Sequence, residues 1–367
     1  MSILIFFGVL FVLVVVHEWG HFIAAKKLGI RVDEFGVGFP PKAYGFTPKG
    51  SETEYSINWL PIGGFVRIFG EDPNDESIKG PDGARSFVNK PAWVRAVVLV
   101  AGVTMNILLA YLLYVVAFSM GILTSTESID GGHMRDQQVV VYEAFEGAPA
   151  DVAGLSSGDL IVGIEGVSSD IAITGQAITT HIAQAKDSPV TLLVNSNGER
   201  KPITVTPQTG ILESNPSEYA IGVSMGDVAI VSYPFYKALL VAGEHTASMF
   251  YQIVVGLGSL LFDAIRLDAD LSSVSGPVGI VSLVGDASAL GIVYLLSFTA
   301  FISLNLAVIN LLPFPALDGG RLFFLVIEKI KGSAINPKIA NTVNAVGFAF
   351  LIILMVVVTI SDIFKFF

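Results

Sequence analysis

The sequence predicts a polytopic α-helical membrane protein with four transmembrane helices, a β-hairpin after the first of them and one inserted, β-rich domain outside the membrane. Of its 367 residues, 52% are hydrophobic and only 14% are charged. The mean hydropathy of +0.68 is too high for an ordinary soluble enzyme. Four long apolar segments, with one polar and strand-rich segment between the second and the third, give the predicted arrangement.

Composition also excludes several kinds of partner and chemistry. The chain has 21 Lys and Arg against 32 Asp and Glu, and this net charge of -11 argues against nucleic acid, which needs a basic face. It contains no cysteine, which excludes disulfides, thiolate zinc ligands and a cysteine nucleophile. Any zinc would therefore be bound by histidine and carboxylate side chains.

The predicted transmembrane helices are residues 1–24, 93–121, 289–317 and 345–364. A helix crosses the hydrocarbon core with about 20 mostly apolar residues. The first segment could be mistaken for a cleaved signal peptide. It lacks a basic N-terminal region, however, and its apolar character resumes at Phe22–Ala24 after a polar interruption, which favours a retained helix.

Residues 25–92, which follow the first helix, are polar, mixed in charge and rich in glycine and proline. Within them, the alternation at Tyr55–Ile68 predicts two strands that turn at Pro61–Gly64. Periodicity alone favours an ordinary surface hairpin at this place.

Residues 233–288 contain an apolar stretch, Phe235–Phe262, that carries Lys237, Glu244 and His245. A buried helix, a fifth span and a helix at the membrane surface are all compatible with this pattern. We favour the surface helix, because a fifth span would move the basic loop 318–344 to the outer side of the membrane, against the rule that basic loops stay in the cytoplasm.

The distribution of basic residues predicts the orientation in the membrane. Lysine and arginine are concentrated in the loops 25–92 and 318–344, whereas the long loop 122–288 has far fewer for its length. Because basic loops stay in the cytoplasm, both termini and the long loop are placed outside the cytoplasm. The C-terminal end of the first helix is then cytoplasmic.

The first helix carries the motif His17-Glu18-Trp19-Gly20-His21. Residues four apart lie on one face of a helix, so both imidazoles can reach one metal ion while Glu18 sits beside the water bound to it. Ionisable groups within a membrane are costly and indicate a functional site. The motif is typical of zinc proteases.

A carboxylate near the end of the third helix complements these histidines. The segment N-L-L-P-F-P-A-L-D-G-G runs from Asn310 to Gly320, and its prolines break the helix. Asp318 could be an ordinary loop carboxylate. The predicted topology nevertheless brings it to the same membrane side as His21, and two histidines with one carboxylate are the ligand set of a catalytic zinc site.

The long loop contains one small β-rich domain, residues 122–232. Its glycine pattern in Gly147–Leu155, followed by Gly158-Asp159-Leu160-Ile161, resembles the PDZ domains of bacterial envelope proteases. PDZ domains capture extended peptides by adding them as a strand to a sheet edge. The resemblance implies that Ile221, Gly222 and Val223 form the loop that cradles the peptide.

Motifs along the whole chain together resemble one protease family. They are H-E-x-x-H, A-G-x-x-x-N at Ala101, Gly102 and Asn106, the PDZ insert, S-G-P-V-G-I at Ser275–Ile280, and N-L-L-P-x-P-x-L-D-G-G. In this order they are similar to the site-2 protease family, and more narrowly to its bacterial regulator-of-sigma-E protease branch. One departure is that well-known members carry two PDZ modules, whereas this loop has room for one.

The resemblance implies roles for individual residues. Asp318 is then the third ligand of Zn²⁺, Glu18 is the general base, and Asn310 holds the substrate backbone or the developing oxyanion. The hairpin after the first helix dips into the membrane and pairs with the unwound substrate, which makes Gly63, Gly64, Phe65 and Val66 a substrate platform.

The resemblance also implies a substrate class and a place of action. The expected enzyme is a zinc-dependent intramembrane endopeptidase of the bacterial cytoplasmic (inner) membrane, active in regulated intramembrane proteolysis. Its substrates would be single-span membrane proteins, namely anti-sigma factors and remnant signal peptides. The alternative is a non-catalytic membrane scaffold that binds partner tails through its PDZ domain. A transporter is disfavoured because the sequence shows no internal repeats.

Overall fold

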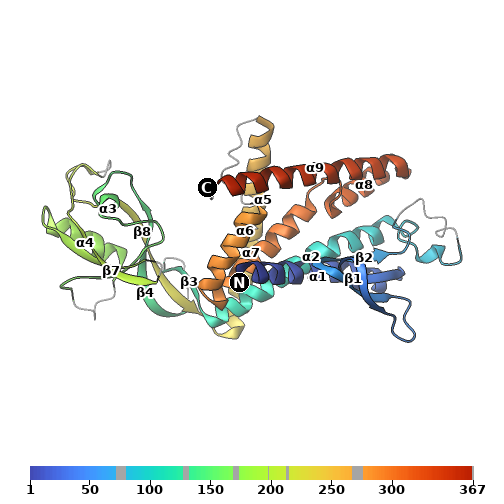
Figure 1. The fold of residues 1–367 in the computed structure, drawn as a ribbon, viewed down its shortest axis with the longest axis horizontal. Coiled ribbons are helices and arrows are strands. Elements are labelled where there is room, and N and C mark those ends of the chain that lie inside the picture. The colour runs from blue at the N-terminus through green and yellow to red at the C-terminus, as the bar shows by residue number, and fades with distance from the viewer. Residues whose placement is uncertain are drawn as a thin grey trace. The chain divides into compact units, whose positions relative to one another are not determined.

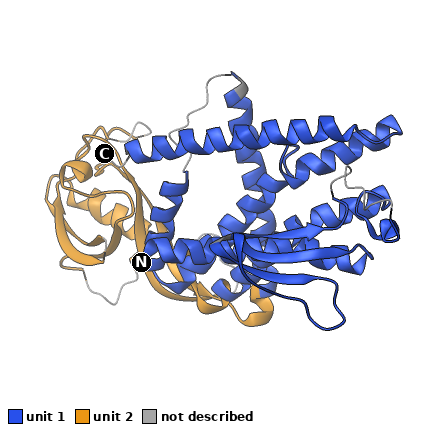
Figure 2. Cartoon of the chain, turned by 45° about the vertical axis from the view of Figure 1, so that its right-hand side comes forward, with its two compact units in different colours: residues 1–117, 239–367 blue, residues 118–238 orange. Residues whose placement is uncertain are grey.

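A computed structural model describes residues 1–71, 80–126, 132–167, 173–196, 198–211, 215–266 and 276–365 (Figure 1). The first serine of the S-G-P-V-G-I motif, Ser275, lies outside this part of the chain. The chain forms two compact units, one of residues 1–117 with 239–367 and the other of residues 118–238 (Figure 2).

The first unit is built mainly of helices. They are α1 (Ser2–Lys27), α2 (Ala92–Met120), α5 (Phe235–Arg266), α6 (Pro277–Ala289), α7 (Ile292–Leu311), α8 (Asp318–Lys331) and α9 (Pro337–Lys365), together with the short 3-10 helix η2 (Gly83–Arg85). Five of the helices in the described ranges, α1, α2, α5, α7 and α9, are long and apolar enough to cross a membrane. This confirms an integral membrane protein with several apolar helices.

The expected count of four spans differs from these five helices by α5. Its first 30 residues, Phe235–Ala264, have the lowest hydropathy of the five, and their most apolar window contains no buried residue. In Figure 1 and Figure 2, α5 runs across the direction of α1 and α9 rather than along it. Length and composition alone do not separate a span from a surface helix, so the count of four stays a prediction.

Helix boundaries follow the prolines more closely than the hydropathy pattern does. α7 ends at Leu311, before Pro313 and Pro315, whereas the apolar run continues to residue 317. α9 begins at Pro337, inside the expected loop 318–344. The hydropathy pattern missed this start, because several side chains in the first two turns of α9 are polar. α8 occupies the first part of the same expected loop.

The chain reverses direction at Pro61–Gly64, as predicted, because residues 64–67 pair antiparallel with residues 34–37, whereas residues 54–57 pair with the same residues in parallel. β1 (Val32–Phe46) and β2 (Glu54–Ile68) form the hairpin, and the chain reverses between them at residues 47–53. Gly63 has a φ of +82°, and the register shifts there from Phe39↔Leu60 to Val37↔Gly64. β2 therefore folds back on itself near Gly63, and the positive φ of this glycine suits a turn.

The hairpin is wider than two straight strands, because β1 folds back on itself between residues 37 and 42 and β2 does so between residues 58 and 64. Gly36 pairs with Phe65 on one side and with Ser56 on the other, and Ser56 also pairs with Gly45. The segment Gly64–Arg67 therefore lies at one edge, and within the described ranges no further strand pairs with it.

The second unit contains a six-stranded sheet of strand order β3-β8-β4-β5-β6-β7. Its elements are β3 (Ile122–Ser125), β4 (His133–Ala144), α3 (Pro149–Val152), β5 (Leu160–Ile164), α4 (Gly175–Ala185), β6 (Val190–Ser196), β7 (Glu199–Val205) and β8 (Val223–Ser232). Alternating side chains of β4, β5 and β6 pack against Ile178 and Ile182 of α4 in one core. All neighbouring strands are antiparallel, which is the β-rich domain expected from residues 122–232.

Candidate metal centre

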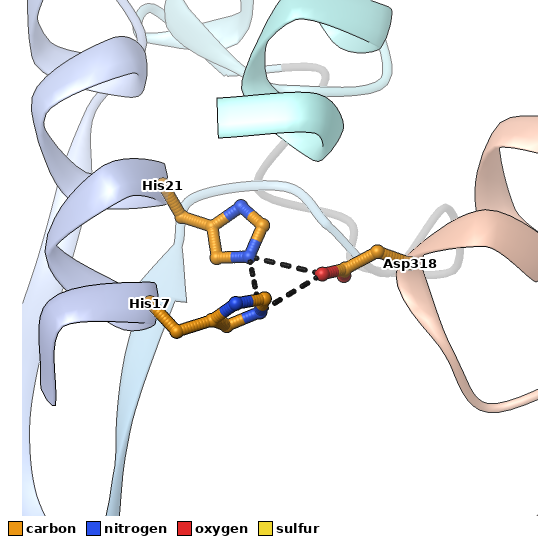
Figure 3. Close-up of side chains that lie close together, drawn as sticks. All are labelled: His17, His21 and Asp318. Carbon is orange, nitrogen blue, oxygen red and sulfur yellow. Dashed lines mark hydrogen bonds and ion pairs between the residues drawn. The ribbon is translucent and has the colours of Figure 1, made fainter. Parts of the chain in front are cut away.

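α1 and the start of α8 bring two imidazoles and one carboxylate together. His17 and His21 lie one turn apart on α1, and their Nε2 atoms are 3.2 Å from each other. Asp318 Oδ2 lies 3.0 Å from Nε2 of His17 and 3.2 Å from Nε2 of His21 (Figure 3). Among the residues that the structure describes, these three form the group of side chains that could hold a metal ion.

The P-F-P loop holds Asp318 in place. It connects α7 to α8, and the two glycines after Asp318 pack against its backbone. A Cβ on Gly319 would overlap the carbonyl oxygen of Leu312, and one on Gly320 would overlap that of Phe314. The D-G-G sequence therefore allows a close approach that turns the first residue of α8 toward α1.

α2 passes closely over the two histidines. A Cβ on Gly20 of α1 would overlap the backbone of Ala101, so the two helices touch there. One residue further on, a Cβ on Gly102 would overlap Nε2 of His21 and lie 2.9 Å from Nε2 of His17. Glycine at this position keeps open the space that the donor atoms face.

The three donor atoms fit a zinc ion. Ligands bound tetrahedrally at about 2.0–2.1 Å lie about 3.4 Å from one another, close to the separations of 3.0–3.2 Å found here. The outer nitrogen of each ring also has a polar neighbour. Nδ1 of His21 is 2.8 Å from the carbonyl oxygen of Val98, and Nδ1 of His17 is 3.2 Å from the amide of Asn106.

The surroundings of Asp318 favour its charged form. Burial by itself would raise the pKa of this carboxyl, but the hydrogen bonds with His17 and His21 outweigh burial and hold the pKa below its usual range. An ionised carboxylate is the form that binds a metal ion.

A cavity of about 360 Å³ adjoins the three side chains and is lined by most of the predicted site residues of the first unit. Besides them it is lined by Glu18, by Asn310 of α7, and by Phe65 and Val66 of β2. The two glycines of the predicted platform lie against α1: the Cβ position of Gly63 is 3.7 Å from Val14, and that of Gly64 is 3.9 Å from Cγ of Glu18.

A second cavity, of about 530 Å³, adjoins the first. The two share Ile68, Glu71, Phe87, Leu99 and Arg321 in their linings. Arg321 forms an ion pair with Glu71 at this junction. Sequence reasoning counted Arg321 only as a basic loop residue, although its position one helical turn after Asp318 places it beside the site.

Ile221, Gly222 and Val223 belong to the other unit, where they lead into β8. Ile221 is buried in the core, and Gly222 has a φ of +75°. β3 pairs with residues 228–231 of β8. Within the described ranges, residues 223–227 of β8 therefore have no strand on that side. α4 lies near this edge, because the N–H of Gly175 donates to Asp227 Oδ1 at 2.6 Å.

Residues 5–354 match the model of peptidase family M50. The chain belongs to this family. An M50 relative in Bacillus subtilis, named regulator of sigma-W protease RasP, is 30% identical, and the match covers all of this chain and 98% of that protein. A zinc metalloprotease RasP of Shouchella clausii is also 30% identical over all of this chain and 99% of its own length. A Clostridium acetobutylicum protein, whose name marks it as a candidate zinc metalloprotease, is 35% identical over 96% of this chain and 94% of its own.

A solved structure also resembles part of this M50 peptidase. The PDZ domain of an SdrC-like protein of Listeria innocua is 26% identical, with a TM-score of 0.21, over 24% of this chain and 92% of that one.

Family membership confirms the resemblance to site-2 proteases found in the sequence. It also confirms the expected class of enzyme, an intramembrane zinc metalloendopeptidase, and its cofactor, Zn²⁺.

Proposed function

We propose that this M50 peptidase hydrolyses a peptide bond of a single-span membrane protein, with His17, His21 and Asp318 as the zinc ligands. The three donor atoms, 3.0–3.2 Å apart beside a cavity that Glu18 lines, are the observation that carries this proposal. Bound Zn²⁺ would supply a water of lowered pKa and polarise the scissile carbonyl.

Glu18 is the general base and acid of this proposal. It follows His17 directly and lines the cavity, but its side chain is not among the three donors that lie together. From there it takes a proton from the attacking water and passes it to the leaving amine. The amide of Asn310, on the cavity wall, is placed to donate to the substrate carbonyl oxygen as negative charge develops on it.

The hairpin edge at Gly64–Arg67 is the proposed substrate platform. A transmembrane substrate is helical and has no free backbone groups, so it must unwind before it can be cut. The edge has unpaired backbone positions, and Phe65 and Val66 face the cavity that holds the ligands. A substrate strand added there would recover its backbone hydrogen bonds next to Glu18.

Four membrane crossings, with α5 at the outer surface, are part of the proposal. Arg95 at the start of α2 forms a 3.0 Å ion pair with Glu328 of α8, which supports placing the end of α7 on the side where α2 begins. An even number of crossings must then lie between α2 and α7. α5 alone would make one, and α6, with 13 residues, is too short to make a second.

From the loop charges we infer that the metal centre lies toward the cytoplasm, with both termini and the PDZ-like unit outside, and from the family resemblance that the membrane is a bacterial inner membrane. The second cavity, lined by Arg67, Arg95 and Arg321, would then bring water from the cytoplasmic side. Because one relative is named a regulator of sigma-W protease, we take anti-sigma factors and remnant signal peptides as the substrate class.

Zinc content and cleavage of a single-span peptide by the purified chain in detergent test this proposal. Glu18→Gln should keep its zinc and lose activity by about 100- to 10,000-fold, because it removes only the proton transfer. Asp318→Ala should lower both zinc content and activity. Glu199→Gln, an exposed carboxylate of the other unit, is the control and should change neither.

Full activity of Glu18→Gln would contradict the mechanism. A wild-type chain that binds zinc and cleaves no single-span peptide would instead favour the non-catalytic PDZ scaffold. Full zinc content in Asp318→Ala would contradict the ligand set instead.

A further inference from the structure

Asn106 is a fully buried amide on α2, one turn after Gly102. Its Nδ2 atom lies 3.2 Å from Nδ1 of His17, on the side of the ring away from the metal-facing atoms. Its Oδ1 atom is buried and has no hydrogen-bond partner within the described part of the chain. A buried amide oxygen without a partner costs about 1–3 kcal/mol, so such an atom needs an explanation.

The chemistry of His17 provides one. Nε2 of His17 faces Asp318 and His21, so it is the nitrogen that would bind zinc. A neutral imidazole that binds a metal through Nε2 carries its proton on Nδ1. Two N–H groups cannot bond to each other, so the amide of Asn106 would have to present its oxygen to this proton.

A half-turn of the amide about its Cβ–Cγ bond achieves this without moving the backbone. Nitrogen and oxygen of an amide occupy nearly equivalent positions, so the half-turn places Oδ1 about where Nδ2 lies now. Without zinc, the orientation found here suits the other tautomer of His17, in which Nε2–H donates to Asp318 and Nδ1 accepts from Nδ2.

We infer that Asn106 is a positioning residue for His17, whose amide accepts Nδ1–H when zinc is bound and donates to Nδ1 when zinc is absent. The inference rests on the ligand set proposed above. His21 needs no such group, because the carbonyl of Val98 can only accept and so keeps the proton on Nδ1 of His21 in both states. An amide is the side chain that can serve both tautomers of His17.

α7 fixes the backbone from which this amide reaches His17. The buried hydroxyl of Ser303 donates to the carbonyl oxygen of Asn106 at 2.8 Å. This bond involves the backbone of Asn106 and leaves its side chain free to turn. Ser303→Ala therefore offers a matched control, which loosens the α2–α7 contact but preserves the amide.

The test measures zinc affinity of the full-length chain in detergent by competition with a chelator. Asn106→Leu, which has a similar shape and no polar atom, should bind zinc about 10- to 100-fold more weakly, as expected when the partner of a metal-binding histidine is lost. Asn106→Asp, which keeps an acceptor, should bind zinc within a few-fold of the wild type. Ser303→Ala should melt at a lower temperature and bind zinc as the wild type does.

Melting of the zinc-free proteins separates weak binding from poor folding. Asn106→Leu should melt no lower than Ser303→Ala in the absence of zinc, because only its contact with His17 is lost. Wild-type zinc affinity in Asn106→Leu, together with lost affinity in His17→Ala, would overturn this inference and leave the ligand set intact. Wild-type affinity in His17→Ala would overturn the ligand set itself.

Discussion

At Gly102, α2 passes so close to α1 that a side chain has no room. The Cβ of any other residue would overlap Nε2 of His21 and lie 2.8 Å from Cε1 of His17. The three candidate ligands could be predicted from the sequence, because zinc chemistry in a chain without cysteine restricts them to few residue types. The role of Gly102 could not, since it depends on how closely two helices cross.

Gly102→Ala is therefore expected to damage the metal centre. Overpacking of this kind costs about 1–3 kcal/mol, and here the side chains that must move are the proposed ligands His17 and His21. Zinc content of the purified variant should fall together with peptide cleavage. Gly8→Ala on α1 is the control, because its Cβ would meet no atom within 4 Å of the described residues. Equal zinc content in both variants would show that the space above the histidines is not needed.

Among the elements, those whose identity depends on local pattern could be predicted, and those that depend on long-range pairing could not. α1, α2 and the strands β4–β7 follow from apolar runs and alternation. The turn within β2 at Pro61–Gly64 follows from its proline and glycines, but the pairing of residues 34–37 with both halves of β2 does not, because it joins segments 20 or more residues apart. The placement of Asp318 beside His17 required the topology of the whole chain.

The position of α5 at the outer surface can be tested with single cysteines, since the natural chain contains none. Tyr236→Cys and Asp263→Cys lie near the two ends of α5. If α5 does not cross the membrane, a membrane-impermeant maleimide applied to the outer face should label both. Lys329→Cys on α8 should be labelled only from the cytoplasmic face. Labelling of Asp263→Cys from the cytoplasmic face alone would make α5 a fifth span.

For the whole molecule, the division into two compact units puts the proposed catalytic residues and the PDZ-like sheet edge in different units. The first unit contains all three candidate ligands, Glu18 and the hairpin edge, and the second contains the open edge of β8 beside α4. Motifs at both ends of the chain and the PDZ-like insert allowed this division to be predicted from the sequence. The boundaries of this unit differ from the predicted range 122–232. The compact unit comprises residues 118–238 and therefore includes the last residues of α2 and the first residues of α5.

Removal of the PDZ-like unit tests whether it excludes substrates with intact outer domains. Ile122 pairs with Val231 at the base of the sheet, so a short Gly-Ser linker can replace residues 122–232 without stretching the chain. The shortened enzyme should keep its zinc and cleave a bare single-span peptide at a rate close to that of the wild type. It should cleave the same peptide fused to a folded outer domain faster than the wild type does.

Gly222→Val in the full-length chain separates steric exclusion from peptide binding. Gly222 has a φ of +75°, and its Cβ position overlaps that of Ala148, so valine should distort the start of β8 and leave the bulk of the unit in place. If bulk alone excludes substrates, this variant should still reject the fused peptide, and only the shortened enzyme should accept it. Rejection of the fused peptide by the shortened enzyme would instead place the selection in the first unit.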